Sequence, residues 1–156
     1  MQWACISFPQ LALDDALRQR SDGAAPLVVF EGAGSRARVC AANAAAQHHG
    51  LYAGQSLTAA RALYPRVNTV GHDAAAVERR HDFLAAWAYR YSSQVCRTFP
   101  GTLLLEVRAS FRLFGGWPAL QAALRRDRAA LGFQHRIAAA PNPRAAMVLA
   151  SARDGC

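Results

Sequence analysis

The sequence predicts an α+β fold in which an antiparallel, ferredoxin-like sheet is backed by helices and a smaller unit is inserted after the first strand. Two observations support this prediction. From Asp73 onward, the hydrophobic patterns follow the order helix, strand, strand, helix, strand and helix. Before that point, one strand and one helix are followed by a run of short elements. We therefore expect residues 1–22 and 73–156 to form the main sheet and residues 23–72 to form the inserted unit.

The N-terminal half contains short elements with clear end signals. The apolar run WACISF predicts a buried strand that ends at Pro9, and LALDDALRQR, residues 11–20, predicts a helix. PLVVFEG and ARVCAA predict two strands that form a hairpin around the glycine-containing AGSR. Two short helices follow, and the residues suited to cap and end them are Asn43, Gly50, Ser56 and Pro65.

The C-terminal half begins with the longest predicted helix, residues 74–91, whose apolar face includes His81. No second ligand lies nearby, so this histidine is expected to be a satisfied core residue. QVCRTF and TLLLEVRA predict two strands joined by a Pro-Gly turn. A helix follows between Pro118 and Gly132, and after it come the strand FQHRIAAA and a last helix capped by Asn142.

The charge of the chain is strongly positive. Its 18 basic residues, all of them Arg, outnumber 10 acidic ones and give a formal net charge of +8. Guanidinium groups bind phosphate in a bidentate manner, so this excess favours a polyanionic partner, and nucleic acid is favoured over a membrane surface. No apolar run approaches the length needed to span a bilayer. We expect a cytoplasmic protein.

Four cysteines, Cys5, Cys40, Cys96 and Cys156, are spread along the chain without a CxxC pair or a histidine at ligand spacing. This spacing indicates neither a zinc site nor a disulfide framework. We expect no bound metal or cofactor, and we expect the thiols to be small core groups in a reducing compartment.

Two stretches carry a specific family resemblance. VCAANAAAQHHGLYAGQSLTAARALYP, residues 39–65, resembles the fingers segment of Y-family translesion DNA polymerases. LLLEVRASFRLFGGWPAL, residues 103–120, resembles the signature of the ImuB branch of that family, and FPQLALDDAL and AAAPNPRAAMVLA are similar to the same branch. The resemblance implies a split palm, residues 1–22 and 73–156, with a small fingers subdomain, residues 23–72, inserted after the first strand. The family's thumb, little finger and C-terminal tail have no counterpart in these residues.

The resemblance also identifies the positions at which active members carry the groups for phosphoryl transfer. That chemistry needs two Mg²⁺ ions held by carboxylates. The four carboxylate positions of the family fall on Ser7, Pro9, Gly101 and Thr102. The Tyr and Arg that face the incoming nucleotide fall on Ala44 and Gln47. The resemblance therefore implies a degenerate site without catalytic, metal-binding or nucleotide-binding residues.

Three other acidic residues do not replace the missing carboxylates. Glu106 follows the leucines of the central strand and matches a family position that is not a metal ligand. A slip in register would be needed to bring it into the site, and a one-residue slip turns a side chain to the opposite face of the sheet. Asp14 and Asp15 are expected on the solvated face of their helix.

Two arginines are candidates for binding. Arg38 and Arg112 are candidate contacts with a phosphate or a partner protein. For Arg112 a structural role is the alternative, in which its aliphatic part covers Phe114 and its guanidinium is solvated or bonded to a backbone carbonyl. The following Gly-Gly pair, residues 115–116, predicts a close turn that Phe111 and Phe114 anchor to the core.

The resemblance implies a non-catalytic homologue that acts as an adaptor in damage-induced translesion DNA synthesis and mutagenesis. Such an adaptor joins the sliding clamp, an ImuA-type protein and an error-prone replicative-type polymerase, and we expect weak, salt-dependent contact with DNA. Two alternatives stay open. One is an active, metal-dependent translesion polymerase fragment. The other is a general nucleic-acid-binding module, which requires exposed aromatic residues on neighbouring strands, and for this Phe99 and Phe111 are few and isolated.

Overall fold

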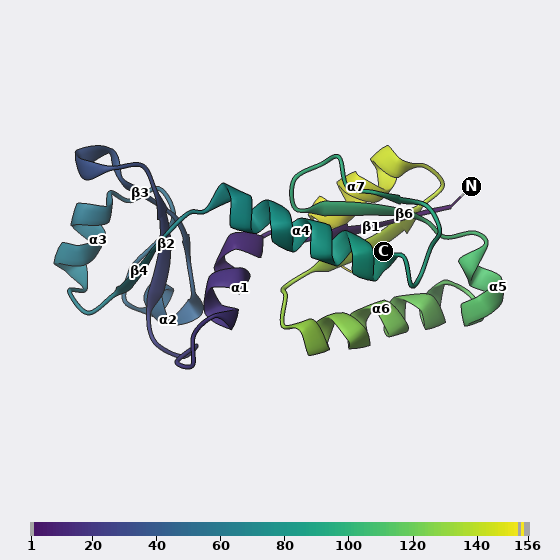
Figure 1. Ribbon diagram of the computed structural model, residues 1–156, viewed down its shortest axis with the longest axis horizontal. Coiled ribbons are helices and arrows are strands. Elements are labelled where there is room, and N and C mark those ends of the chain that lie inside the picture. The colour runs from purple at the N-terminus through teal and green to yellow at the C-terminus, as the bar shows by residue number, and fades with distance from the viewer. Residues whose placement is uncertain (1, 153, 155–156) are drawn as a thin grey trace. The chain divides into compact units, whose positions relative to one another are not determined.

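The apolar run near the N-terminus becomes a central strand of an antiparallel sheet in the computed structural model, which describes residues 2–152 and 154 (Figure 1). The elements of this part are β1 (Trp3–Ser7), α4 (Ala74–Ala88), β5 (Val95–Cys96), β6 (Thr102–Glu106), α5 (Ser110–Phe114), α6 (Trp117–Leu131), β7 (Arg136–Ala140) and α7 (Pro143–Ala152). The four strands lie in the order β5-β6-β1-β7, and neighbouring strands are antiparallel. This is the ferredoxin-like arrangement, and the α+β prediction is confirmed.

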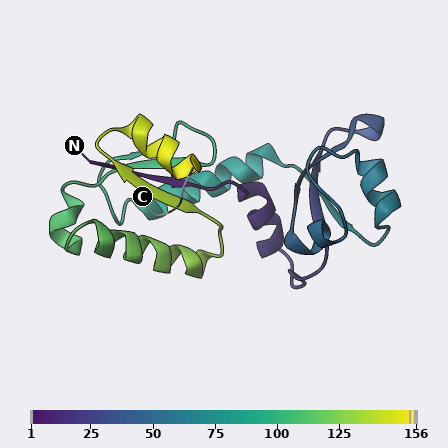
Figure 2. The same ribbon diagram turned by 180° about the vertical axis from the view of Figure 1, so that it is seen from behind.

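Helices cover both faces of this sheet. Successive residues of β1 point to opposite faces, and on one face Cys5 is buried in a cluster with Ala146 and Ala150 of α7. α4 and α6 lie on the other face (Figures 1 and 2). The end of α4 lies beside α6, as shown by the hydroxyl of Tyr91, just after α4, which donates a hydrogen bond to Asp127 of α6. The sheet therefore has a buried core on each side.

The apolar face of α4 is placed as its spacing predicts. His81 is 2% exposed and its Nε2 lies 3.1 Å from the carbonyl oxygen of Thr102. Trp87 is also buried. The prediction that His81 is a satisfied core residue is confirmed. At the start of the helix, the Asp73 carboxylate accepts a hydrogen bond of 3.0 Å from the N–H of Ala76 and caps the first turn.

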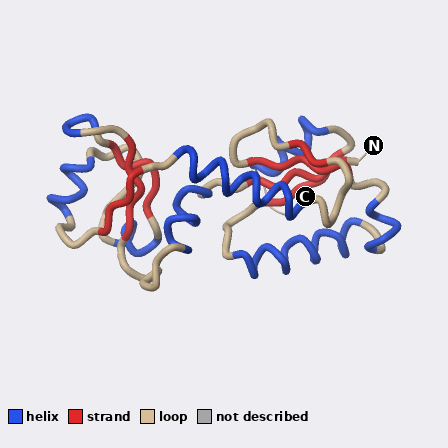
Figure 3. Tube along the Cα trace, viewed as in Figure 1, coloured by secondary structure: helices blue, strands red, loops and turns tan. Residues whose placement is uncertain are grey.

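The segment between β1 and α4 folds around a core of its own. Its elements are α1 (Leu11–Arg18), β2 (Leu27–Glu31), a 3₁₀ helix (Gly34–Arg36), β3 (Arg38–Ala42), α2 (Ala44–His48), α3 (Leu57–Leu63) and β4 (Asn68–Gly71). The strands form a second sheet in the order β3-β2-β4, shown in red in Figure 3. β2 and β3 form the predicted hairpin, whereas β4, which pairs in parallel with β2, is not predicted.

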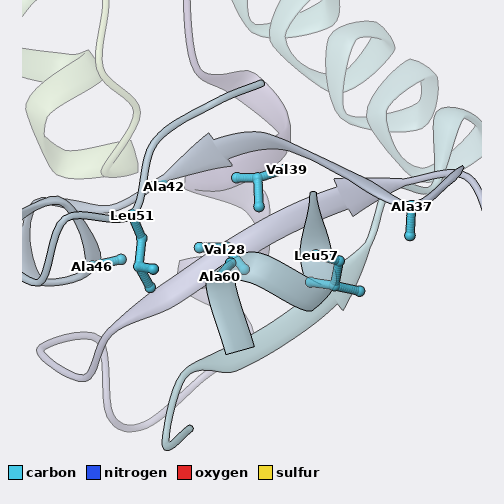
Figure 4. Packing of buried hydrophobic residues seen from close by; sticks show 8 residues of the cluster. All are labelled: Val28, Ala37, Val39, Ala42, Ala46, Leu51, Leu57 and Ala60. Atoms are coloured by element: carbon cyan, nitrogen blue, oxygen red, sulfur yellow. The ribbon is translucent and has the colours of Figure 1, made fainter. Parts of the chain in front are cut away.

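Small apolar side chains from the strands and short helices fill the core of this segment. Figure 4 shows the cluster, which consists of Val28, Ala37, Val39, Ala42, Ala46, Leu51, Leu57 and Ala60. Asn43 and Ser56 cap α2 and α3 as predicted, since their side-chain oxygens accept hydrogen bonds from the N–H groups of Ala46 and Ala59. The caps fix where each helix begins beside the sheet.

Contacts between residues divide the chain into one unit of Met1–Leu11 with Glu78–Cys156 and a second unit of Ala12–Val77. The inserted segment predicted at residues 23–72 lies within the second unit. That unit also contains most of α1, because Leu13 is buried in a cluster with Leu27 and Val29 of β2. α4 and α6 have 15 residues each. Among the described residues, no helix has the length and apolar character needed to cross a membrane.

The described cysteines differ in exposure. Cys5 is buried, and burial raises the pKa of its thiol to about 11. Cys40 is exposed, so the prediction of a core position is wrong for this residue. The cause is the alternation of β3, which turns Val39 to the core and Cys40 away from it. Cys96 is partly buried, and Cys156 lies outside the described residues.

Candidate functional site

One end of the main sheet brings together three of the four positions that the resemblance assigns to metal carboxylates. Ser7, at the end of β1, lies directly opposite Thr102, at the start of β6. Directly paired residues of antiparallel strands place their side chains on the same face. Gly101 precedes Thr102, and its carbonyl oxygen accepts a hydrogen bond of 2.8 Å from the N–H of Phe8. This end of the sheet therefore carries two neighbouring hydroxyl groups and a glycine.

The backbone at Gly101 is suited to glycine. Its φ is +59°, which lies in the left-handed region that side chains disfavour by about 1 to 2 kcal/mol. A Cβ atom at this position would lie 3.1 Å from the carbonyl oxygen of Phe8. Pro9 is exposed in the turn after β1 and has no side chain that binds a cation. A side chain at position 101 would therefore be strained and would require the Phe8 carbonyl group to shift by a few tenths of an ångström.

Arg136 adds a positive charge to the same row of residues. It is the partner of Ser7 on β7, and its guanidinium donates a hydrogen bond of 2.7 Å to the carbonyl oxygen of Ser151 on α7. Cα atoms of paired antiparallel residues lie about 5 Å apart, so a cation on a paired residue opposes the binding of a divalent metal. Sequence reasoning missed Arg136, because only the register of β7 against β1 places it beside Ser7.

Glu106 is held away from this end of the sheet. It lies opposite Trp3, at the other end of β6. At about 3.3 Å per residue, the Cα atoms of Thr102 and Glu106 are about 13 Å apart. The Glu106 carboxylate accepts hydrogen bonds from the backbone N–H groups of Gln2 and Arg108. Within residues 2–152 and 154, no group of three His, Cys, Asp or Glu side chains is arranged to hold a metal ion.

The prediction that Asp14 and Asp15 lie on a solvated face is wrong. Both are buried, with exposures of 4% and 5%. α1 is buried on more than one side, since Leu11 and Leu13 are buried as well, and the charged residues that mark its polar side in the sequence are enclosed. The Asp15 carboxylate accepts a hydrogen bond of 3.3 Å from the side-chain amide of Gln19.

The positions assigned to the triphosphate grip lie in the second unit. Ala44 and Gln47 are both exposed on α2, and residues three apart on a helix share a face. The side-chain amide of Gln47 donates a hydrogen bond of 2.9 Å to the carbonyl oxygen of Ala42. Arg38 is exposed on β3, where Glu31 of β2 is its cross-strand partner. The sheet end that carries Ser7 belongs to the first unit.

Arg112 lies on a short helix, α5, that directly precedes the turn predicted at Gly115 and Gly116. α5 ends at Gly115, with φ +84°, and Gly116, with φ +104°, leads into α6. The ring of Phe114 lies 5.6 Å from the ring of Tyr91 and anchors the helix. Arg112 is exposed. In the part of the chain that the structure describes, no carboxylate or carbonyl oxygen binds its guanidinium, so its head is free to bind another molecule.

Comparison of the sequence with models of known protein families identifies the family of this chain. The sequence model of the impB/mucB/samB family matches residues 15–151. The chain belongs to this family. No curated protein gives a significant match by sequence.

Solved structures share the fold of this impB/mucB/samB family member. DinB from Sulfolobus solfataricus superimposes with a TM-score of 0.72 at 16% identity, over 99% of this chain and 46% of that one. A post-insertion binary complex of Dbh DNA polymerase gives a TM-score of 0.77 at 17% identity, over 99% of this chain and 46% of that one. A Y-family DNA polymerase chimera gives a TM-score of 0.72 at 18% identity, over 99% of this chain and 47% of that one. The fold is that of the palm and fingers of Y-family polymerases, and the chain spans slightly less than half of the solved proteins that it matches.

Proposed function

We propose that this chain is the palm and fingers of a non-catalytic Y-family homologue of the ImuB type, which acts as an adaptor in damage-induced translesion DNA synthesis and mutagenesis. The observation that carries the proposal is the pairing of Ser7 with Thr102 beside Gly101. Two-metal phosphoryl transfer needs carboxylates at such a place. Hydroxyl groups carry no charge to hold two divalent cations beside a triphosphate.

Two features of the backbone and the charge distribution support this proposal. The left-handed conformation of Gly101 and its contact with Phe8 oppose a side chain at that position. Arg136, paired with Ser7, supplies positive charge where an active enzyme needs negative charge.

The triphosphate grip is also absent at its assigned positions. A methyl group at Ala44 and a neutral amide at Gln47 stand in place of a phenol and a guanidinium. Loss of one charge-assisted hydrogen bond to phosphate costs about 1.5 to 3 kcal/mol. Nucleotide binding by this chain should therefore be weak even before the missing metal ions are considered.

The adaptor role follows from the ImuB-type signature. We propose that the whole protein joins an ImuA-type protein, an error-prone replicative-type polymerase and the sliding clamp, and that the clamp-binding peptide of the family lies outside these residues. The net charge of +8 favours weak contact with DNA. This contact should weaken steeply as the salt concentration rises, because binding releases counterions from the phosphates.

A general nucleic-acid-binding module is not favoured. Ferredoxin-like modules of that kind stack bases on aromatic residues of an open sheet face. Here helices cover both faces of the main sheet (Figures 1 and 2). Phe99 and Phe111 lie outside its strands, in a loop and on α5.

Calorimetric titration with Mn²⁺ and a deoxynucleoside triphosphate tests the proposal. The natural chain is compared with Ser7→Asp/Thr102→Glu, which adds carboxylates to the paired positions, and with Ser7→Asn/Thr102→Gln, which adds similar volume without charge. We expect no saturable heat from the natural chain or from the amide control. Saturable binding at micromolar ligand by the natural chain would contradict the proposal and restore the enzyme alternative.

A further inference from the structure

A pocket lies at the end of the main sheet remote from Ser7 and Thr102. Its volume is about 470 Å³. The residues that line it come from the segment before β5, the end of β6, the turn that follows β6, and α5, and they are Gln94, Glu106, Arg108, Ala109 and Arg112. None of the positions assigned above to metal or nucleotide is among them. The pocket is therefore separate from the degenerate site.

The charge of this pocket is positive. Arg108, in the turn before α5, and Arg112 of α5 are both exposed, and both line the pocket. Among the described residues, no carboxylate forms an ion pair with either guanidinium. The carboxylate of Glu106 is engaged by the backbone N–H groups of Gln2 and Arg108. Two guanidinium groups in this arrangement suit an incoming carboxylate, which they can bind in a bidentate manner.

An exposed apolar side chain follows Arg112 on α5. Leu113 is 84% exposed, more than any other large apolar side chain of the described residues. It lies four residues after Ala109, the N-cap residue of α5, which lines the pocket, so the two lie on the same side of this turn. Water around a leucine this exposed is released when a partner's apolar side chain covers it.

α5, which carries Arg112 and Leu113, is held in place before any partner binds. The Ser110 hydroxyl donates a hydrogen bond of 2.5 Å to the carbonyl oxygen of Tyr91. The Phe114 ring packs near the Tyr91 ring, and Gly115 in the left-handed conformation ends the helix. A prearranged surface loses little conformational entropy on binding.

We propose that Arg108, Arg112 and Leu113, here called the α5 surface, bind an acidic segment of a partner protein. A carboxylate of that segment enters the pocket between the two guanidinium groups, and a neighbouring apolar side chain covers Leu113. A DNA backbone would satisfy the arginines but would leave Leu113 in water, so a peptide fits the combination better. The inference extends the adaptor role proposed above and rests on it, but its test measures peptide binding, so the two proposals can fail separately.

The test uses the whole 156-residue chain and a fluorescein-labelled peptide of repeated Asp-Asp-Leu units. A peptide of repeated Asn-Asn-Leu units and a labelled oligothymidylate are the comparison probes. Arg112→Glu and Leu113→Ser alter the α5 surface. Their matched controls are Arg144→Glu and Val148→Ser, which change exposed residues of α7 in the same way. Amide resonances of the isotope-labelled chain locate the bound peptide.

We expect the acidic peptide to shift resonances of α5 and to bind at least about tenfold more weakly to Arg112→Glu, as loss of a charge-assisted pair predicts. Leu113→Ser should weaken binding as well, whereas the two α7 variants should bind like the natural chain. Equal losses for Arg112→Glu and Arg144→Glu would overturn the proposal, because they would show general attraction to a basic protein. The proposal also fails if the peptide does not bind, or if oligothymidylate alone shifts the α5 resonances.

Discussion

Ser7 and Thr102 lie directly opposite each other on β1 and β6, and Arg136 lies on the other side of Ser7, on β7. The row across the three strands thus consists of two hydroxyl groups and one guanidinium. Its formal charge is positive at the place where the family resemblance puts the carboxylates of a two-metal site. This relationship connects the fold, which is shared with Y-family polymerases, to the proposal that the chain has lost their chemistry.

Replacing Gly101 by Ala should destabilise the fold. The left-handed φ of +59° and the distance of 3.1 Å between a Cβ atom and the Phe8 carbonyl oxygen both oppose a side chain. We expect the free energy of unfolding, measured in urea, to decrease by about 2 kcal/mol. Gly115→Ala is the matched control, because Gly115 has φ +84° but open space around its Cα. An equal loss for the two variants would argue against the contact with Phe8.

Removing the side chain of Asn43 should cost more than removing another helix cap. The Asn43 side-chain oxygen accepts hydrogen bonds from the N–H groups of Leu27 and Ala46, and its amide donates to the carbonyl oxygen of Ala25. Asn43→Ala leaves these buried groups without partners and should lower the free energy of unfolding by about 3 kcal/mol. Ser56→Ala, which removes a single capping bond, should cost about 1 kcal/mol. Urea unfolding of both variants measures the difference, and similar losses would contradict the account of Asn43.

The parts of the fold that depend on local signals could be predicted from the sequence. Asn43, Ser56 and Asn142 cap helices, the last by accepting a hydrogen bond from the N–H of Ala145, because a cap depends only on residues within one turn of the chain. The order of strands and helices limits the main sheet to few topologies. β4 was missed because its pairing in parallel with β2 joins distant segments. Arg136 was missed for a similar reason, since strand register is not a local property.

The burial of several side chains was also not predicted from the sequence. The acidic residues of α1 mark a polar side of the helix, yet Asp14 and Asp15 are enclosed. The alternation of β3 exposes Cys40, although cysteine is usually buried. Packing of neighbouring elements outweighs the ordinary preference of the residue type at Asp14 and Asp15, and the face on which the strand places the side chain outweighs it at Cys40.

Stability at alkaline pH should depend on Tyr91. Burial, together with the hydrogen bond to Asp127, raises the pKa of the Tyr91 hydroxyl to about 12. A phenol in the unfolded chain ionises near pH 10, so the folded state binds more protons between these values and stability falls as the pH rises through them. Tyr91→Phe should remove this decrease between about pH 10 and pH 12, as measured by urea unfolding.

The control for this prediction is Tyr89→Phe, which alters an exposed tyrosine. It should leave the alkaline decrease in stability unchanged. If Tyr91→Phe loses stability with rising pH as steeply as the natural chain, the hydroxyl of Tyr91 is not the group responsible.

The most direct test of the central claim is paramagnetic broadening by Mn²⁺ of the amide resonances of Ser7, Gly101 and Thr102. In the natural chain these resonances should broaden no more than those of exposed residues elsewhere, because no carboxylates hold a cation there. In Ser7→Asp/Thr102→Glu we expect selective broadening at the same positions. Selective, saturable broadening of these three resonances in the natural chain would contradict the account and show that this end of the sheet still binds a catalytic metal.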